Sequence, residues 1–253
     1  GRDRQCELLD LALARLRPDG RLVFAGAKNE GVKPALREAR KRFGHAGIVV
    51  RKGGYHAGLA RRPPGEFESP ELTFERDTII VDGVATDLVT CTGVFAPGRL
   101  DPGTANLIAG MNISSRTKVL DIGCGAGLAG LTAARRGADV IWTDVSARAV
   151  ESARRTLLAN EITEPQLHLC HGAKAVEDHS VDTVVTNPPF HQGHDVNYEV
   201  SRLFVREACR VLKPGGEVYL VANNFLPYLR WLRENFVSVS IVREDPQFNV
   251  YRS

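Results

Sequence analysis

The residues best suited to chemistry in this sequence lie where a short valine-rich run meets two prolines. The run 181–186 is typical of a buried strand. Asn187, Pro188 and Pro189 cannot continue it, because proline fixes φ and lacks an N–H donor. The side-chain carbonyl of Asn187, the unpaired backbone carbonyls and the ring of Phe190 can together hold a planar group that carries an NH₂. An isolated Asn-Pro-Pro is as readily an ordinary turn, so this interpretation depends on a second motif.

The second motif is the glycine-rich segment 118–130, which reads KVLDIGCGAGLAG. A short strand ends near Asp121, and a turn then opens a helix predicted over about 128–136. The turn contains Gly123, Gly125 and Gly127. Such a turn lets backbone N–H groups approach a ligand at a helix N-terminus, which favours anionic groups. Leu128 stands where the fingerprint G-x-G-x-x-G has its third glycine, so a nicotinamide cofactor is disfavoured.

A carboxylate follows the next predicted strand. Residues 138–142 read as that strand, and Asp144 lies just past its end, where a carboxylate can accept from both hydroxyls of a ribose. At this point the sequence resembles the class I S-adenosylmethionine-dependent methyltransferases. With the NPPF segment after the fourth strand, it is similar to those that methylate an exocyclic NH₂ of a base or a glutamine amide.

Further segments narrow the resemblance to the ribosomal RNA guanine-N2 methyltransferases. They are FHQG at 190–193, VANNFLPY at 221–228, FNVYR at 248–252, GVF at 93–95 and LDPGT at 100–104. The likeness extends from about Leu72 to the last residue. It implies an α/β fold of the class I methyltransferase type, with a doubly wound, seven-stranded sheet whose last strand is antiparallel.

The resemblance also implies which residues form the site. Those assigned to the cofactor are Phe95, Thr104, Asp121, Gly123, Cys124, Gly125, Gly127, Asp144, Val145, Ala173 and Asn187. Those assigned to the acceptor amine are Asn187, Pro188, Pro189 and Phe190. Many relatives have an acidic residue for the adenine amino group after the strand at 166–170, where this chain has His171-Gly172-Ala173. A backbone N–H or a neighbouring polar side chain is expected to replace it.

The elements that position these residues follow from the hydrophobic pattern. Strands are predicted at 118–121, 139–143, 166–170, 181–186, 217–222, 237–243 and 247–252, with helices between them until the last pair. That alternation predicts a doubly wound sheet. Ligands of such sheets lie beyond the carboxyl ends of the strands, where Gly123, Asp144 and Asn187 all fall. An upstream hairpin is predicted from strands at 78–81 and 85–90, with Asp82-Gly83 as its turn.

The beginning of the chain repeats its end. Residues 16–25 align with 212–221 as a helix end, a turn and a strand. The following helices, 34–43 and 227–236, and the strands after them, 47–51 and 240–244, also correspond. Two generic units of this kind can also match by chance. Residues 1–65 are predicted to be a partial, degenerate copy of the methyltransferase fold and 66–253 the catalytic domain, with 61–65 as the linker. The chain is therefore expected to be a fragment that starts inside a fold.

Charge separates these two parts. Residues 1–65 hold 15 Lys and Arg against 6 Asp and Glu, a net charge of +9, whereas the remaining residues hold 18 against 24, a net charge of −6. A basic part of this kind can dock RNA phosphates, although residues 37–42 can equally be a solvated helix face. The cations available for docking are Lys28, Lys33, Arg37, Arg40, Lys41, Arg42, Arg51, Lys52, Arg61 and Arg62.

Composition excludes several other classes. No apolar run approaches the roughly 20 residues that span a bilayer. The five cysteines are scattered, with no C-x-x-C and no histidine cluster at ligand spacing, so neither a disulfide framework nor a metal site is indicated. A monomer in a reducing cytoplasm is expected.

The predicted activity is methyl transfer from S-adenosylmethionine to the N2 amino group of a guanine in ribosomal RNA, in the first place 16S rRNA of the small subunit, with rRNA or the ribosomal subunit as partner. The alternative is an adenine-N6 or a protein glutamine amide methyltransferase, which would bind its amino group with the same segment, 187–190. A non-catalytic RNA-binding module is a second alternative, but the intact glycine loop, Asp144 and Asn187 count against it.

Overall fold

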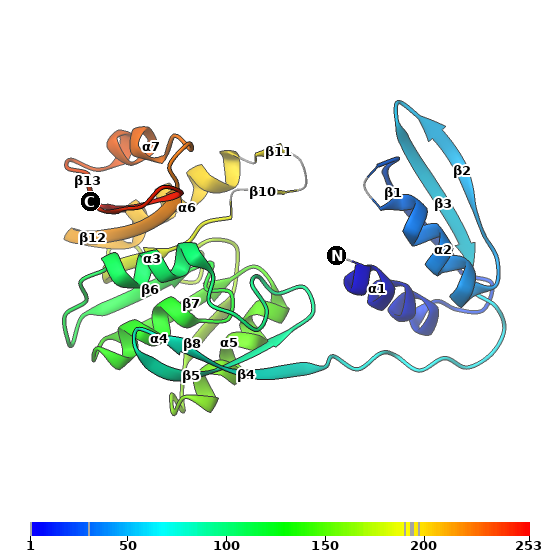
Figure 1. Ribbon diagram of the computed structural model, residues 1–253, viewed down its shortest axis with the longest axis horizontal. Coiled ribbons are helices and arrows are strands. Elements are labelled where there is room, and N and C mark those ends of the chain that lie inside the picture. Colours follow the sequence, from blue (N-terminus) through cyan, green and yellow to red (C-terminus); the bar gives the residue numbers. More distant parts are fainter. Residues whose placement is uncertain (1, 30, 190, 193–194, 197) are drawn as a thin grey trace. The chain divides into compact units, whose positions relative to one another are not determined.

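The computed structural model describes residues 2–29, 31–189, 191–192, 195–196 and 198–253, with no side chain described from 190 to 198. The chain divides into two compact units, Gly1–Thr73 and Phe74–Ser253 (Figure 1). The division falls after Thr73 rather than after the predicted residue 65. Residues just past the predicted boundary are tied to the first unit, because Arg62 is buried there, donates to Leu13 O at 2.8 Å and to Gly65 O at 2.8 Å, and stacks on Phe67.

A seven-stranded sheet forms the centre of the second unit. Its strands are β6 (Lys118–Ile122), β7 (Asp139–Asp144), β8 (Gln166–Leu169), β9 (Val181–Thr186), β12 (Leu212–Asn223), β13 (Ser240–Glu244) and β14 (Phe248–Arg252). They are ordered β13-β14-β12-β9-β6-β7-β8. The strands from β12 to β8 pair in parallel, whereas β14 is antiparallel to both of its neighbours. The predicted seven-stranded sheet with an antiparallel last strand is confirmed.

Helices cover both faces of this sheet (Figure 1). One face carries α3 (Pro102–Gly110), α4 (Leu128–Arg135), α5 (Ala147–Ala159) and the hairpin of β4 (Phe74–Val81) and β5 (Val84–Cys91). The other carries α6 (Tyr198–Val211) and α7 (Tyr228–Asn235). Successive strand residues alternate between the two cores, with Val119 in the first and Leu120 in the second. The hairpin turns at Asp82-Gly83, as predicted, and both residues have positive φ. Two short strands, β10 (His191–Gln192) and β11 (Asp195–Val196), pair after the proline corner.

The first unit is a small helix-and-sheet body of its own. It consists of α1 (Arg2–Arg15), β1 (Arg21–Ala27), α2 (Val32–Phe43), β2 (Ala46–Lys52) and β3 (Tyr55–Arg61). The strands are antiparallel in the order β1-β3-β2. Its core consists of Leu9, Leu13, Ala39, Phe43, Ala46 and Ala60.

The predicted repeat extends to the pairing of the strands. The order β1-β3-β2 matches β12-β14-β13, and the third strand of each copy lies antiparallel between the other two. Both copies even shift register in the same strand, between Ile48 and Val50 and between Ile241 and Arg243. Strand β3 was missed by the sequence analysis, because its alanines and Gly58 lack the usual β-branched signal. A Cβ on Gly58 would lie 2.4 Å from the ring of Phe24, so a small residue is needed there.

No helix in the described part of the chain is long and apolar enough to cross a membrane.

Candidate functional site

Asn187 follows the carboxyl end of β9 and is held by the first turn of α3. Its side-chain Nδ2 donates to Asp101 Oδ2 at 3.0 Å and to Thr104 Oγ1 at 3.0 Å. Within the described residues its Oδ1 has no hydrogen-bond partner, so this oxygen is available as an acceptor. The predicted acceptor corner therefore contains a side-chain carbonyl held in place from the opposite end of the amide.

The remaining residues of this corner are only partly described. Pro188 is buried and Pro189 is exposed. Phe190, to which the sequence analysis gave the stacking role, lies outside the described residues. A ring is nonetheless close by, because a Cβ on Gly103 would lie 3.2 Å from Asn187 Nδ2 and 3.4 Å from Phe248 Cε1. Phe248 at the start of β14 therefore borders this corner, and the sequence analysis had not assigned it to the site.

The glycine loop is fastened to the neighbouring strand. Gly123 N–H and Cys124 N–H both donate to Thr143 O, at 2.8 and 3.0 Å. Gly123, Gly125 and Gly127 have φ of 71°, 57° and 87°, which only glycine adopts without strain. A Cβ on Gly125 would meet no atom within 4 Å, so the loop leaves open space on that side. This space, beside the half-buried Gly123 and Gly125, suits a small polar ligand.

Asp144 links this loop to the end of β7. Its Oδ2 accepts from Gly125 N at 3.0 Å and its Oδ1 from Ser146 N at 2.8 Å. Burial raises the pKa of Asp144. Each carboxylate oxygen keeps a lone pair, so the group can still accept from two hydroxyls of a ribose. The carboxylate of Asp144 thus fits the ribose of S-adenosylmethionine, and the open glycine loop fits its methionine part.

Asp121 has a structural task beside any role in binding. It is only 2% exposed, and its Oδ2 accepts from Gly130 N at 2.9 Å, which satisfies a free donor in the first turn of α4. Burial raises the pKa of Asp121 to about 7. Gly130 was not predicted as important, yet a Cβ there would lie 2.1 Å from Trp142 Nε1, so only glycine lets α4 approach the sheet this closely.

The other residues assigned to the cofactor fall into different surroundings. Val145, 68% exposed beside Asp144, and Phe95, 62% exposed, both have accessible side chains. Cys124 is buried, which raises its thiol pKa. Ala173 has a fully buried side chain and its N–H donates to Glu207 Oε2 at 3.1 Å, so its role at the cofactor stays a prediction.

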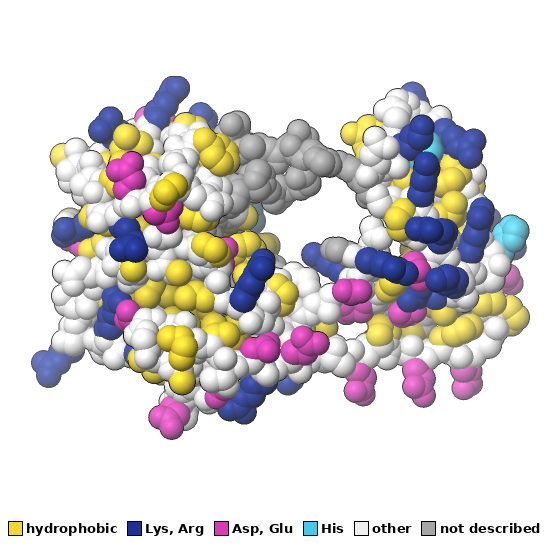
Figure 2. Space-filling model, in the orientation of Figure 1, with side chains coloured by type: hydrophobic (Ala, Val, Ile, Leu, Met, Phe, Trp, Pro, Cys, Tyr) yellow, Lys and Arg dark blue, Asp and Glu magenta, His cyan; other side chains and the backbone are white. Residues whose placement is uncertain are grey.

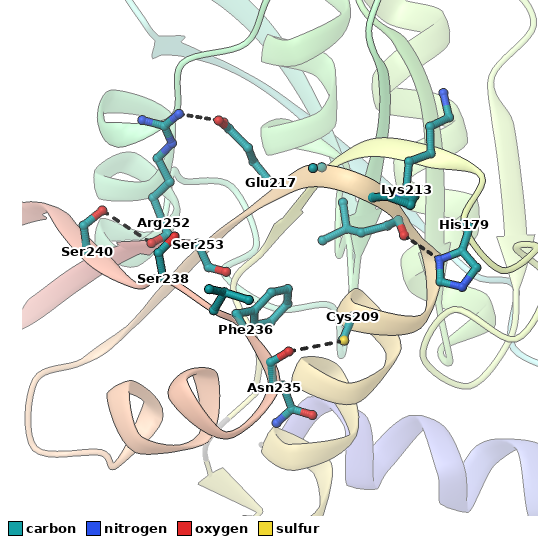
Figure 3. Close-up of a pocket in the computed structure, with 15 residues that line it drawn as sticks. His179, Cys209, Lys213, Glu217, Asn235, Phe236, Ser238, Ser240, Arg252 and Ser253 are labelled. Atoms are coloured by element: carbon teal, nitrogen blue, oxygen red, sulfur yellow. Dashed lines mark hydrogen bonds and ion pairs between the residues drawn. The ribbon is translucent and has the colours of Figure 1, made fainter.

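A cavity of about 640 Å³ lies elsewhere in the second unit (Figure 3). Its walls include Lys213 and Glu217 from the first half of β12, Phe236 after α7, and Arg252 at the end of β14. It opens at the amino end of β12, opposite the edge that carries Asn187, and it is lined by none of the predicted site residues. Within the described residues, no group of three or more His, Cys, Asp or Glu is placed to hold a metal ion.

Comparisons with known proteins agree on one family. The methyltransferase small domain family matches residues 85–252. The ribosomal RNA small subunit methyltransferase C of Hahella chejuensis is 36% identical over 98% of this chain and 74% of its own length. That of Alcanivorax borkumensis is 33% identical over 99% of this chain and 76% of its own. A solved structure, the T. thermophilus 16S rRNA N2 G1207 methyltransferase with AdoMet and guanosine, matches with a TM-score of 0.87 and 31% identity, over 98% of this chain and 68% of the other.

Proposed function

This chain belongs to the ribosomal RNA small subunit methyltransferase C family, and from that premise we propose that it methylates the N2 amino group of a guanine in 16S ribosomal RNA. It is an S-adenosylmethionine-dependent methyltransferase. The family inferred from the NPPF, LDPGT and FNVYR segments is thereby confirmed.

The observation that carries the proposal is the orientation of Asn187. An exocyclic amino group offers two N–H donors, and a residue that binds it must present an acceptor. Asn187 uses its own NH₂ on Asp101 and Thr104, which leaves Oδ1 for the substrate. It also follows the carboxyl end of a central strand, the same sheet edge as the glycine loop and Asp144.

The difficult part of the reaction is the low reactivity of the acceptor, the guanine amino nitrogen. S-adenosylmethionine would supply a methyl group bonded to a sulfonium: the C–S bond breaks as the C–N bond forms, a neutral thioether leaves, and the methylated nitrogen then loses one proton to solvent. The lone pair of a guanine amino group is delocalised into the ring, so the nitrogen must be oriented. Asn187 Oδ1 and the Pro188 carbonyl accept its two N–H bonds and stabilise the positive charge that develops on nitrogen. Positioning of this kind can supply much of the acceleration without a general base.

The cofactor is held by the neighbouring loop. Asp144 binds the ribose hydroxyls, and the segment 121–127 surrounds the methionine end. Thr104 and Phe95 are proposed to line that end as well, although Thr104 Oγ1 also accepts from Asn187. Phe190 is proposed to stack on the substrate guanine once that base has turned out of its RNA helix or loop. These roles are supported by the open side of Gly125 and by the two amide contacts of Asp144.

The first unit is proposed to dock RNA, with the whole chain acting as a monomer in the cytoplasm. Figure 2 shows many dark blue side chains over residues 1–73. The structure divides the ten cations into two groups. Arg62 is buried, and Arg42, Lys41 and Arg61 pair with acidic side chains. The exposed cations without an acidic partner within the described residues are Lys28, Lys33, Arg37, Arg40, Arg51 and Lys52.

Mapping the product tests the proposal. The chain is incubated with labelled S-adenosylmethionine and unmodified 16S rRNA, both free and assembled in small subunits, and nucleosides are identified by mass spectrometry. N2-methylguanosine is the expected product. Label in N6-methyladenosine or in a ribosomal protein would overturn the proposal in favour of the two alternative amine acceptors. Cofactor binding without transfer to any of these substrates would favour a binding module.

A further inference from the structure

The amide of Asn187 is fixed by a partner that can only accept. Its Nδ2 lies 3.0 Å from Asp101 Oδ2 and 3.0 Å from Thr104 Oγ1. An ionised carboxylate has no proton to donate, so the end of the amide that faces Asp101 must be the NH₂ group. A serine or water at this place would not impose that choice, because a hydroxyl both donates and accepts.

We propose that Asp101 is a positioning residue that sets the orientation of the Asn187 amide and so presents Oδ1 to the substrate amine. The inference rests on the proposed function, since an acceptor is needed only if the substrate donates N–H bonds. In the flipped amide, Oδ1 would face the carboxylate and the NH₂ would face the substrate's own N–H. Both contacts would set like groups against each other, so the flip loses more than one hydrogen bond.

Asp101 is itself held rigidly. It is the N-cap of α3, with φ −68° and ψ 138°, and its Oδ2 accepts from Thr104 N at 2.9 Å. Pro102 follows at the first helical position, where its fixed φ suits the helix. The same oxygen therefore caps the helix and holds Asn187, which couples the corner to α3.

A glycine makes this close approach possible. A Cβ on Gly103 would lie 2.9 Å from Asp101 Oδ2 and 3.2 Å from Asn187 Nδ2. Any larger residue at position 103 would press on both ends of the hydrogen bond. The segment LDPGT thus supplies the cap, the helix start, the space and the second acceptor within four consecutive positions, 101 to 104.

The contact has an electronic effect as well as a steric one. A charge-assisted hydrogen bond to Nδ2 polarises the amide and increases the negative charge on Oδ1. That oxygen then stabilises more strongly the positive charge that develops on the substrate nitrogen. Asp101 acts in both respects through Asn187, without touching the substrate.

Two substitutions at Asp101 separate this role from helix capping. Serine, asparagine and aspartate cap helices about equally well, so Asp101→Ser and Asp101→Asn both retain the cap. In Asp101→Asn the carbonyl must face Thr104 N–H to cap, and the same oxygen then accepts from Asn187. In Asp101→Ser the hydroxyl imposes no orientation. We expect a single-turnover rate constant reduced about tenfold to a hundredfold for Asp101→Ser and within about threefold of the parent for Asp101→Asn.

The control measurements are the affinity for S-adenosylmethionine by calorimetry and the melting temperature, both expected to stay near the parent values in the two variants. A double-mutant cycle with Asn187→Ala completes the test, because Asp101→Ser should have no further effect once the amide is gone. Equal rates for Asp101→Ser and the parent, or an undiminished effect in the Asn187→Ala background, would overturn the inference. A parent chain that forms no N2-methylguanosine would overturn the proposed function instead.

Thr104 gives a second route that leaves the cap intact. Thr104→Val removes the hydroxyl at constant shape, and Thr104→Ser restores it. At saturating cofactor we expect a rate loss of about threefold to tenfold for valine and recovery for serine. A valine variant as active as the parent would contradict the role of this second acceptor, whatever the folding of Asp101→Ser.

Discussion

Asn187 is the side chain on which transfer depends most directly. Asn187→Ala should lower the single-turnover rate constant by about 10²- to 10³-fold, because a hydrogen bond formed mainly in the transition state is lost. Cofactor affinity should be nearly unchanged. Stopped assays and calorimetry with S-adenosylmethionine measure the two quantities. Asn112→Ala, an exposed asparagine after α3, is the matched control. A large loss of cofactor affinity in Asn187→Ala would place this residue at the cofactor rather than at the acceptor.

Asp121 makes stability depend on pH in an unusual direction. Its pKa is raised by burial to about 7 in the folded chain, from 3.8. Between these values the folded chain holds a proton that the unfolded chain releases, so this group's contribution to the free energy of unfolding falls as pH rises, and it changes no further above about pH 7. Asp121→Asn, which can still accept from Gly130 N–H, should remove a slope on the order of 1 kcal/mol per pH unit.

Urea unfolding of the ligand-free chain at about pH 5 and about pH 7.5 measures this slope. Asp139→Asn, which changes an exposed carboxylate at the start of β7, serves as the control substitution. If the free energy of unfolding depended on pH in the same way for the parent and Asp121→Asn, burial would not raise the pKa of Asp121.

In helix α3, the residue that helix propensity favours at position 103 differs from the residue that the surrounding contacts allow. Alanine is favoured over glycine inside a helix by about 1 kcal/mol, so helix propensity alone predicts that Gly103→Ala stabilises the chain. The contacts predict the opposite for activity, because the new Cβ would lie 2.9 Å from Asp101 Oδ2. We expect a folded protein with a transfer rate reduced about tenfold or more. The reverse change on the same helix, Ala109→Gly at an exposed position, should lower the melting temperature and leave the rate intact.

The elements were largely predictable, and the contacts between them were not. The strands at 118–121, 139–143 and 181–186 are confirmed, because apolar runs bounded by Gly and Pro are strong local signals. Asp144 was placed correctly at a strand end for the same reason. The link from Asp101 to Asn187 spans 86 residues and depends on where α3 packs. No local pattern reports such a contact, and the same holds for Glu207, which takes the N–H of Ala173.

The distribution of charge belongs to the whole chain. If the first unit docks RNA, then neutralising Lys33, Arg37 and Lys52 to Ala should weaken RNA binding and reduce its dependence on salt. The slope of log K against log salt should become shallower by about 0.7 to 0.9 for each phosphate that is no longer neutralised. Neutralising Arg116, Arg206 and Arg233, exposed cations of the second unit, is the matched control. Filter binding over a salt series measures both, and identical slopes for the two triple variants would assign no docking role to the first unit.

The repeated arrangement of strands also makes the two units differ in a way that isotope exchange can reveal. Residues 219–220 of β12 pair with β9 on one side and with β14 on the other, so consecutive amides are hydrogen-bonded. The corresponding strand β1 pairs with β3 alone among the described strands, so every second amide faces away from a partner strand. In deuterated buffer β12 should therefore retain its hydrogens at successive positions, whereas β1 should lose every other one quickly. The corresponding strands of the two copies thus differ: successive amides are protected from exchange in β12, but only every second amide is protected in β1.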